Sequence, residues 1–165
     1  MSKPSRPSDP KNATGKPRTF FLTTRTAGGR RLLQTERMAI LFIDVLRKCV
    51  RERKFTIHDF VVMPDHVHIL MTVPGDLSVE KAMQLIKGGF SFRARKELNF
   101  KGEVWQRGFS DVRVPDEESF QQHRRYINHN PVKAHLANSP EEFPYGSASL
   151  KESKRIHSRT GDEGQ

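Results

Sequence analysis

The chain has 165 residues, the length of one domain with short extensions, and 35% of them are hydrophobic, which is enough for a modest core. Its formal net charge of +10 favours nucleic acid as a partner, because a basic surface that meets phosphates releases counterions. The single cysteine, Cys49, excludes an internal disulfide and zinc sites of the CxxC type. No stretch approaches the about 20 apolar residues of a membrane span, and the first ten residues lack a signal-peptide core, so we expect a cytoplasmic protein without membrane association.

The two ends of the chain differ in composition from its middle. Residues 1–18 contain four prolines and five basic residues, a composition typical of a disordered basic arm. Residues 147–165 are also polar, and we expect a flexible tail there. Between them, residues 19–146 form one predicted domain without a linker or an internal repeat.

Hydrophobic spacing and turn residues predict the elements of this domain. In chain order they are a strand at 20–26, a helix at 35–53, strands at 55–63 and 66–73, a helix at 77–98, a strand or hairpin at 104–114, and a last helix from 116 that stops before Pro131. This order predicts the α+β class and a ferredoxin-like or RRM-like split βαβ sandwich. We expect a central antiparallel sheet, helices on one face, and the last helix as an addition. Such a fold hosts many functions, so it decides none by itself.

Two histidines on the third predicted strand form the first candidate site. Side chains alternate along a strand, so His66 and His68 share one face, while Val67 and Ile69 face the core. Two neutral imidazoles side by side supply half of a metal site. Taken alone, such a pair is more often two half-exposed strand histidines, so a partner elsewhere in the chain is needed.

The last predicted helix offers that partner. Tyr126 and Asn130 are four residues apart and therefore lie on one helical face. A tyrosine can act as a nucleophile, and an amide oxygen is a common ligand of hard cations. The alternative for Tyr126 is a core or interface ring, and for Asn130 a cap at the end of the helix.

Several sequence blocks resemble a known family. VVMPDHVHILMTVP and RRYINHNPVKA, with AMQLIKGGFSFRARKEL and GEVWQRGFSDVRV between them, are similar to single-tyrosine HUH transposases, and most of all to the REP-associated tyrosine transposases, relatives of the insertion-sequence-200 transposases. The resemblance covers Thr19 to about Ser149. It implies that His66 and His68 bind a divalent cation, Mg²⁺ or Mn²⁺, and that Asn130 completes the protein ligands. It also implies that Tyr126 is the nucleophile.

The resemblance further implies a reaction and a substrate. The Tyr126 oxygen would attack a phosphodiester of single-stranded DNA, and the strand would be rejoined from a 5′-phosphotyrosine intermediate without a nucleotide cofactor. The substrate would be a DNA hairpin with a short single-stranded flank, handled by a monomer or a homodimer at the nucleoid of a bacterial cell. Asp65 could orient one histidine, but we favour a turn role, because Pro-Asp is a common turn pair.

Cations and aromatic rings near these blocks are candidates for DNA contact, since single strands are held by backbone charges and by stacking platforms. These candidates are Lys87, Arg93, Arg95, Trp105, Arg107, Arg124 and Arg125. The alternatives are core packing for the tryptophan and a solvated helix face for the cations. Two other functions are compatible with the sequence: a binding module of the same fold without chemistry, and a metal-dependent nuclease that uses water in place of Tyr126.

Overall fold

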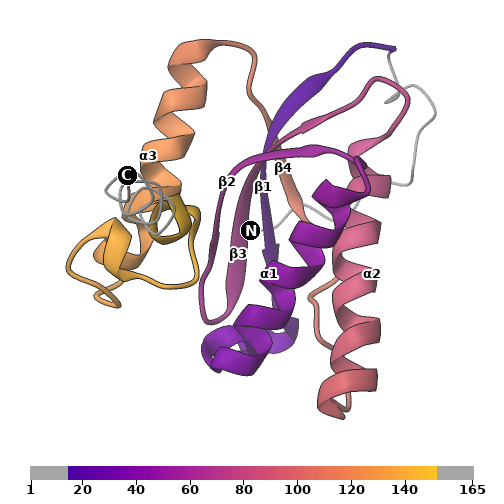
Figure 1. The fold of residues 1–165 in the computed structure, drawn as a ribbon, viewed down its shortest axis with the longest axis vertical. Helices are drawn as coiled ribbons and strands as arrows, with labels where there is room; N and C mark the ends of the chain where they lie inside the picture. Colours follow the sequence, from indigo (N-terminus) through magenta and orange to yellow (C-terminus); the bar gives the residue numbers. More distant parts are fainter. Residues whose placement is uncertain (1–14, 152–165) are drawn as a thin grey trace, which may run out of the picture.

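A four-stranded sheet forms the centre of the computed structural model, which describes residues 15–151 (Figure 1). Its strands lie in the order β2-β3-β1-β4, and every neighbouring pair is antiparallel. The strands are β1 (Arg18–Arg25), β2 (Thr56–Val62), β3 (His66–Val73) and β4 (Ser110–Arg113). The predicted α+β class with a central antiparallel sheet is confirmed, and the prediction of residues 66–73 as a strand matches β3.

Two helices cover one face of the sheet. They are α1 (Glu36–Arg51) and α2 (Val79–Leu98), and together with the sheet they enclose the main core. Thr35 begins α1 as its N-cap, because its side chain accepts a hydrogen bond from the amide of Met38. Strand β1 shows the alternation that this packing requires, since Phe20 and Leu22 are buried in the main core while Phe21 faces the other way.

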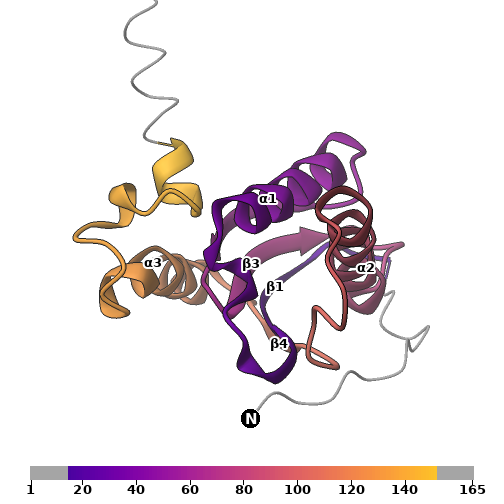
Figure 2. The ribbon, with the colours of Figure 1, turned by 90° about the horizontal axis from the view of Figure 1, so that it is seen from below.

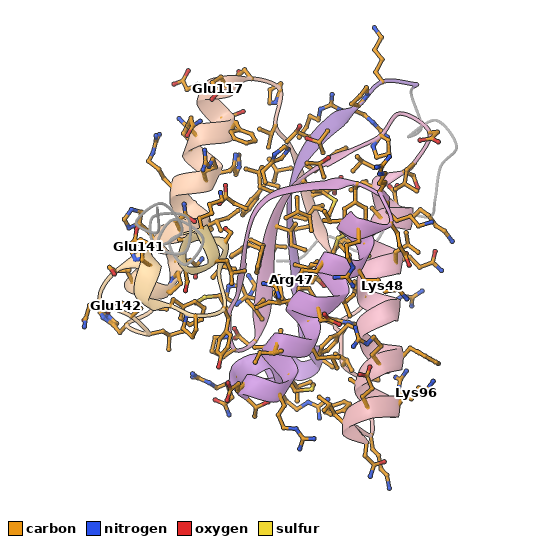
Figure 3. The ribbon with its side chains drawn as sticks, in the orientation of Figure 1. Arg47, Lys48, Lys96, Glu117, Glu141 and Glu142 are labelled. Atoms are coloured by element: carbon orange, nitrogen blue, oxygen red, sulfur yellow. The ribbon has the colours of Figure 1, made fainter. Side chains whose placement is uncertain are left out.

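The third helix, α3 (Glu117–Lys133), packs on the opposite face of the sheet, and Figure 2 shows strands between it and the α1–α2 pair. Ile127 anchors this helix: its side chain is 0% exposed and packs in a small cluster with Leu70 of β3. Asp116 caps the helix by accepting from the Ser119 amide at 2.8 Å, and Glu117 lies in the first turn (Figure 3), where acidic side chains suit the helix dipole.

Two predicted element boundaries are wrong. The last helix does not stop before Pro131 but continues through it to Lys133, and it closes where the Ala134 amide donates to the Asn130 carbonyl at 3.0 Å. A proline this close to the helix end removes one backbone hydrogen bond without ending the helix. The predicted strand or hairpin at 104–114 is reduced to β4, and Trp105 makes only an isolated bridge to Thr26.

The folded part also extends beyond both predicted ends of the domain. Arg18, assigned to the basic arm, is buried in β1 and donates to the Leu77 carbonyl at 2.8 Å. Ser147, assigned to the flexible tail, is buried, and Lys151 approaches the Asp59 carboxylate at 2.8 Å. The rest of the predicted arm and tail, residues 1–14 and 152–165, lies outside the described residues. Within residues 15–151 no helix is long and apolar enough to cross a membrane.

A β-bulge in β2 turns a carboxylate toward α3. Ile57 pairs with Met71 and Asp59 with Leu70, so the two strand residues separated by one position occupy adjacent register steps. Asp59 is 1% exposed, and its carboxylate oxygens lie 2.7 Å from Arg124 Nε and 2.8 Å from the Ser147 hydroxyl. This buried charge therefore joins β2 to α3 and to the end of the folded domain.

We predict that the packing of α3 depends on Ile127. Ile127→Ala should lower the free energy of unfolding by about 2–5 kcal/mol, because it leaves a cavity between α3 and the sheet. Ile40 is a matched control, since it is also helical but 51% exposed, and Ile40→Ala should change stability by less than about 1 kcal/mol. Urea unfolding followed by circular dichroism measures both, and equal losses would contradict this account of α3.

Candidate active site

The two strand histidines lie side by side on the face of the sheet that α3 covers. The ring centroids of His66 and His68 are 4.8 Å apart, and the rings stand at 74° to one another. His68 is 4% exposed, whereas His66 is half-buried. Their neighbours Val67 and Ile69 are buried in the main core on the other side. The expected sharing of one face is confirmed.

Each imidazole has a polar partner at Nδ1. The Nδ1 atom of His66 lies 2.7 Å from Oδ1 of Asp65, and the Nδ1 atom of His68 lies 2.8 Å from Oγ1 of Thr23. Asp65 does lie in the turn between β2 and β3, which the Met63 amide closes by donating to the His66 carbonyl at 2.8 Å, but its side chain also makes the histidine contact that we did not favour from the sequence. These bonds fix both rings through Nδ1, so Nε2 is the atom of each ring that remains for a ligand.

Burial controls the charge of His68. Desolvation by burial, with smaller contributions from the neighbouring His66 and Arg25, lowers the pKa of His68 to about 3. The ring is therefore neutral at pH 7, which is the state in which an imidazole nitrogen can bind a metal ion.

Tyr126 reaches the histidines from α3. Its ring is 5.4 Å from the His68 ring, edge to face, and its side chain is 48% exposed. Phe21 of β1 lies within the same group of rings, 5.2 Å from His68 and 4.6 Å from His123. The structure thus brings together a tyrosine that is open to solvent and a buried imidazole, although 58 positions separate them in the sequence.

The placement of Asn130 follows from the direction of α3. Near the start of the helix, Phe120 packs against the ring of His58. His58 is hydrogen-bonded to Thr72, which lies in the last part of β3. Tyr126 then meets His68, so α3 follows β3 in reverse. Asn130 is one turn further along the helix, toward the end of β3 where the first histidine lies. It is half-buried, and its role as a ligand stays a prediction.

Sequence reasoning missed two residues of this group. Phe21 and Thr23 face the histidines because they alternate with buried residues of β1. The alternation is visible in the sequence, but the pairing of Thr23 with His68 depends on the register between β1 and β3, which no local pattern encodes.

Most of the predicted DNA-contacting residues have partners within the protein. Lys87 Nζ donates to the Gly108 carbonyl at 2.7 Å, and burial lowers the pKa of this lysine. Trp105 donates to the Lys87 carbonyl at 3.0 Å and packs in the main core against Phe42. These bonds hold the segment before β4 against α2.

The arginines divide into engaged and unengaged groups. Arg93 pairs with Asp44 at 2.6 Å, Arg124 pairs with the buried Asp59, and Arg95 approaches the Gly102 carbonyl at 3.5 Å. In contrast, the side chains of Arg107 and Arg125 are exposed and make no hydrogen bond or ion pair with the described part of the chain. They are the arginines most available to a phosphate backbone, although DNA contact stays a prediction for all five.

Comparison with known proteins identifies the class of protein to which the chain belongs. Residues 22–130 match the family described as IS200-like transposases, and the chain belongs to this family. Its class of activity is therefore that of a DNA transposase. The matched region contains the histidine pair, Tyr126 and Asn130, so the resemblance seen in the sequence blocks is confirmed.

Individual relatives show which members of this family the chain is similar to. The chain is 27% identical to a REP-associated tyrosine transposase of Escherichia coli over 78% of this chain and 75% of that protein. A protein of Haemophilus influenzae described as a "putative REP-associated tyrosine transposase" is 28% identical over 52% of this chain and 54% of its own length. Among solved structures, a REP-associated tyrosine transposase bound to a REP hairpin has a TM-score of 0.71 and 25% identity, covering 93% of this chain and 86% of the other. A transposase structure from Deinococcus radiodurans, 20% identical with a TM-score of 0.52 over 76% of this chain and 95% of its own, shares the fold.

We predict that His68 makes the metal-free protein sensitive to acid. Its pKa is about 3 when folded and near 6.5 when unfolded, so the unfolded chain binds more protons between these values. The stability that neutral His68 contributes is complete above pH 6.5 and is lost as the pH falls toward 3, with a slope of about 1.4 kcal/mol per pH unit.

The measurement is urea unfolding between pH 4 and 7 with chelator present. Relative to wild type, His68→Gln should show a shallower loss of stability on acidification. His129 is exposed, so His129→Gln should keep the wild-type slope. A wild-type slope in His68→Gln would show that this ring is not held neutral by the fold.

Proposed function

We propose that the chain nicks and rejoins single-stranded DNA through a covalent bond to Tyr126, at a site that also holds a divalent cation on His66 and His68. The observation that supports this proposal most directly is the meeting of Tyr126 with His68 across the interface between α3 and the sheet, with ring centroids 5.4 Å apart. The proposed nucleophile belongs to α3 and the two proposed cation ligands belong to β3, so this interface brings the groups of the proposed reaction together.

The donor set fits a divalent cation. Asp65 and Thr23 contact the two Nδ1 atoms, so Nε2 is the ring nitrogen of each histidine that a cation would use. Within residues 15–151 no three His, Cys, Asp or Glu side chains form a metal-binding group, so a third protein ligand would be of another type, and the amide oxygen of Asn130 is such a group. Nitrogen and amide oxygen ligands suit Mg²⁺ or Mn²⁺. When bound, the cation would polarise a non-bridging phosphate oxygen.

The proposed step uses the hydroxyl of Tyr126. Its oxygen forms a bond to phosphorus as the bond from phosphorus to the 3′ oxygen breaks, which leaves a 5′-phosphotyrosine and a free 3′-hydroxyl. The phenol proton leaves to solvent, to which this half-exposed side chain is open, and the departing 3′ oxygen takes up a proton. Rejoining reverses these changes with the same or another 3′-hydroxyl. No oxidation occurs, and the phosphodiester energy is kept in the covalent intermediate.

We further propose hairpin DNA with a single-stranded flank as the substrate, which would place the protein at the bacterial nucleoid. Support comes from the solved relative that is bound to a REP hairpin and from the net charge of +10. A single chain would be sufficient for the reaction, because Tyr126 meets His68 of its own chain.

We predict that Tyr126→Phe abolishes the covalent adduct. The substrate is a single-stranded hairpin labelled 3′ of the expected nick, with Mg²⁺ or Mn²⁺ present, and denaturing electrophoresis detects a protein–DNA band. The variant keeps the ring, so it should bind the hairpin while the adduct falls below detection. The matched control is Tyr145→Phe, since Tyr145 is the only other tyrosine of the chain and should leave the adduct unchanged.

The other outcomes of this assay separate the alternatives. Adduct that persists in chelator would contradict the role of the cation. Free fragments without adduct would point to a nuclease that uses water. Tight binding without cleavage, across a varied pool of hairpins, would identify a binding module.

We predict that Arg125 contributes to DNA affinity more than Arg93 does. Arg125 is exposed and unengaged, so Arg125→Ala should weaken hairpin binding and lower the slope of log K against log salt by about 1. Arg93 is held by Asp44 and Glu97, and Arg93→Ala should leave the slope unchanged. Fluorescence anisotropy of a labelled hairpin at several salt concentrations measures both. An equal change in the two variants would contradict this division.

A further inference from the structure

Thr23 lies directly opposite His68 in the sheet. The two residues are cross-strand partners between β1 and β3, and their side chains share the face that α3 covers. Thr23 Oγ1 is 2.8 Å from His68 Nδ1. The His68 ring is also stacked on Phe21, the residue two positions earlier on β1. One strand therefore supplies both the apolar and the polar support of this imidazole.

The two histidines have partners of different chemistry. The Asp65 carboxylate beside His66 is an acceptor only, so it requires a proton on Nδ1 of that ring. A threonine hydroxyl can donate or accept, so the contact with His68 permits two tautomers. Only one of them, with the proton on Nδ1, leaves a lone pair on Nε2. His68 is 4% exposed and neutral, so it carries one ring proton. The nitrogen that holds this proton decides whether Nε2 can bind a cation.

We propose that Thr23 is a positioning residue for the cation site: its hydroxyl accepts a hydrogen bond from Nδ1 of His68 and holds the ring with Nε2 free. This inference rests on the proposed function, because it gives the free Nε2 a cation to bind. Thr23 itself touches neither substrate nor cation in this role. It acts through His68, as Asp65 acts through His66.

The chain contains its own control for this bond. Thr19 lies four residues earlier on β1, on the same face, and its hydroxyl is 2.7 Å from the hydroxyl of Thr72, its cross-strand partner on β3. Thr19→Val and Thr23→Val therefore remove the same group from the same strand and each break a hydrogen bond to β3. Only Thr23→Val affects a residue of the histidine pair.

The first measurement is the tautomer of His68 in the full-length, metal-free protein. Nitrogen-15 NMR at pH 7 distinguishes a protonated from a bare ring nitrogen, and His68→Gln identifies the resonance. We expect Nδ1 to be protonated and Nε2 bare in wild type and in Thr23→Ser. Thr23→Val should shift the population toward a proton on Nε2. A wild-type ring that carries its proton on Nε2 would overturn the proposal, whatever the variants do.

The second measurement is Mn²⁺ affinity, followed by the loss of the free-ion electron paramagnetic resonance signal. Thr23→Val should weaken binding by about 10-fold, while Thr23→Ser and Thr19→Val should bind within about 2-fold of wild type. Wild-type affinity in a folded Thr23→Val would overturn the proposal. If Thr23→Val does not fold, wild type and Thr23→Ser still decide through the tautomer. Failure of the proposed function looks different: wild type and His66→Gln would then bind Mn²⁺ equally weakly.

Discussion

The alternation of side chains along β3 is the constraint on which the rest of the site depends. Val67, Ile69 and Met71 are buried between the sheet and the α1–α2 pair, so the intervening residues must face α3. His66 and His68 thus owe their shared direction to the burial of their apolar neighbours, and no polar contact is needed to choose it. A register shift of one residue would bury the imidazoles in the main core and expose the apolar residues, which makes this arrangement costly to lose.

Helix α3 forms the layer over this face of the sheet and adds the remaining groups of the site to the two histidines. A small apolar cluster, which includes Leu70 and Ile127, seats α3 on the histidine face, and the pair of Asp59 and Arg124 fixes the helix to β2. Tyr126 lies beside the buried side of the helix and is held over His68 while remaining open to solvent. The chain thereby combines a rigid support with the half-exposed tyrosine that we propose as the nucleophile.

Local patterns predicted the elements better than their mutual contacts. The bounds of β3 and the shared face of its histidines were readable because both depend on a period of two within one strand. Thr23 was not readable, because 45 positions separate it from His68 and only the strand register brings them together. Neighbouring arginines were equally hard to separate: Arg124 and Arg125 have the same chemistry, but a helical rotation of 100° directs one to a buried carboxylate and leaves the other exposed. Pro131 was misread as a helix end because its position relative to the last turn depends on packing.

The bulge in β2 makes the pairing of this strand as important as its composition. Beyond the bulge, Asp59 and Val61 face α3 because one extra residue shifts the alternation that Ile57 begins. Regular pairing of every residue onward from Ile57, with His58 kept, would instead turn Asp59 into the apolar layer and point Phe60 toward α3. A strand of the same composition but without the bulge would therefore lose the anion that anchors Arg124. Removal of His58 alone would keep Asp59 opposite Leu70, so in β2 the place of the extra residue decides which side chains face α3.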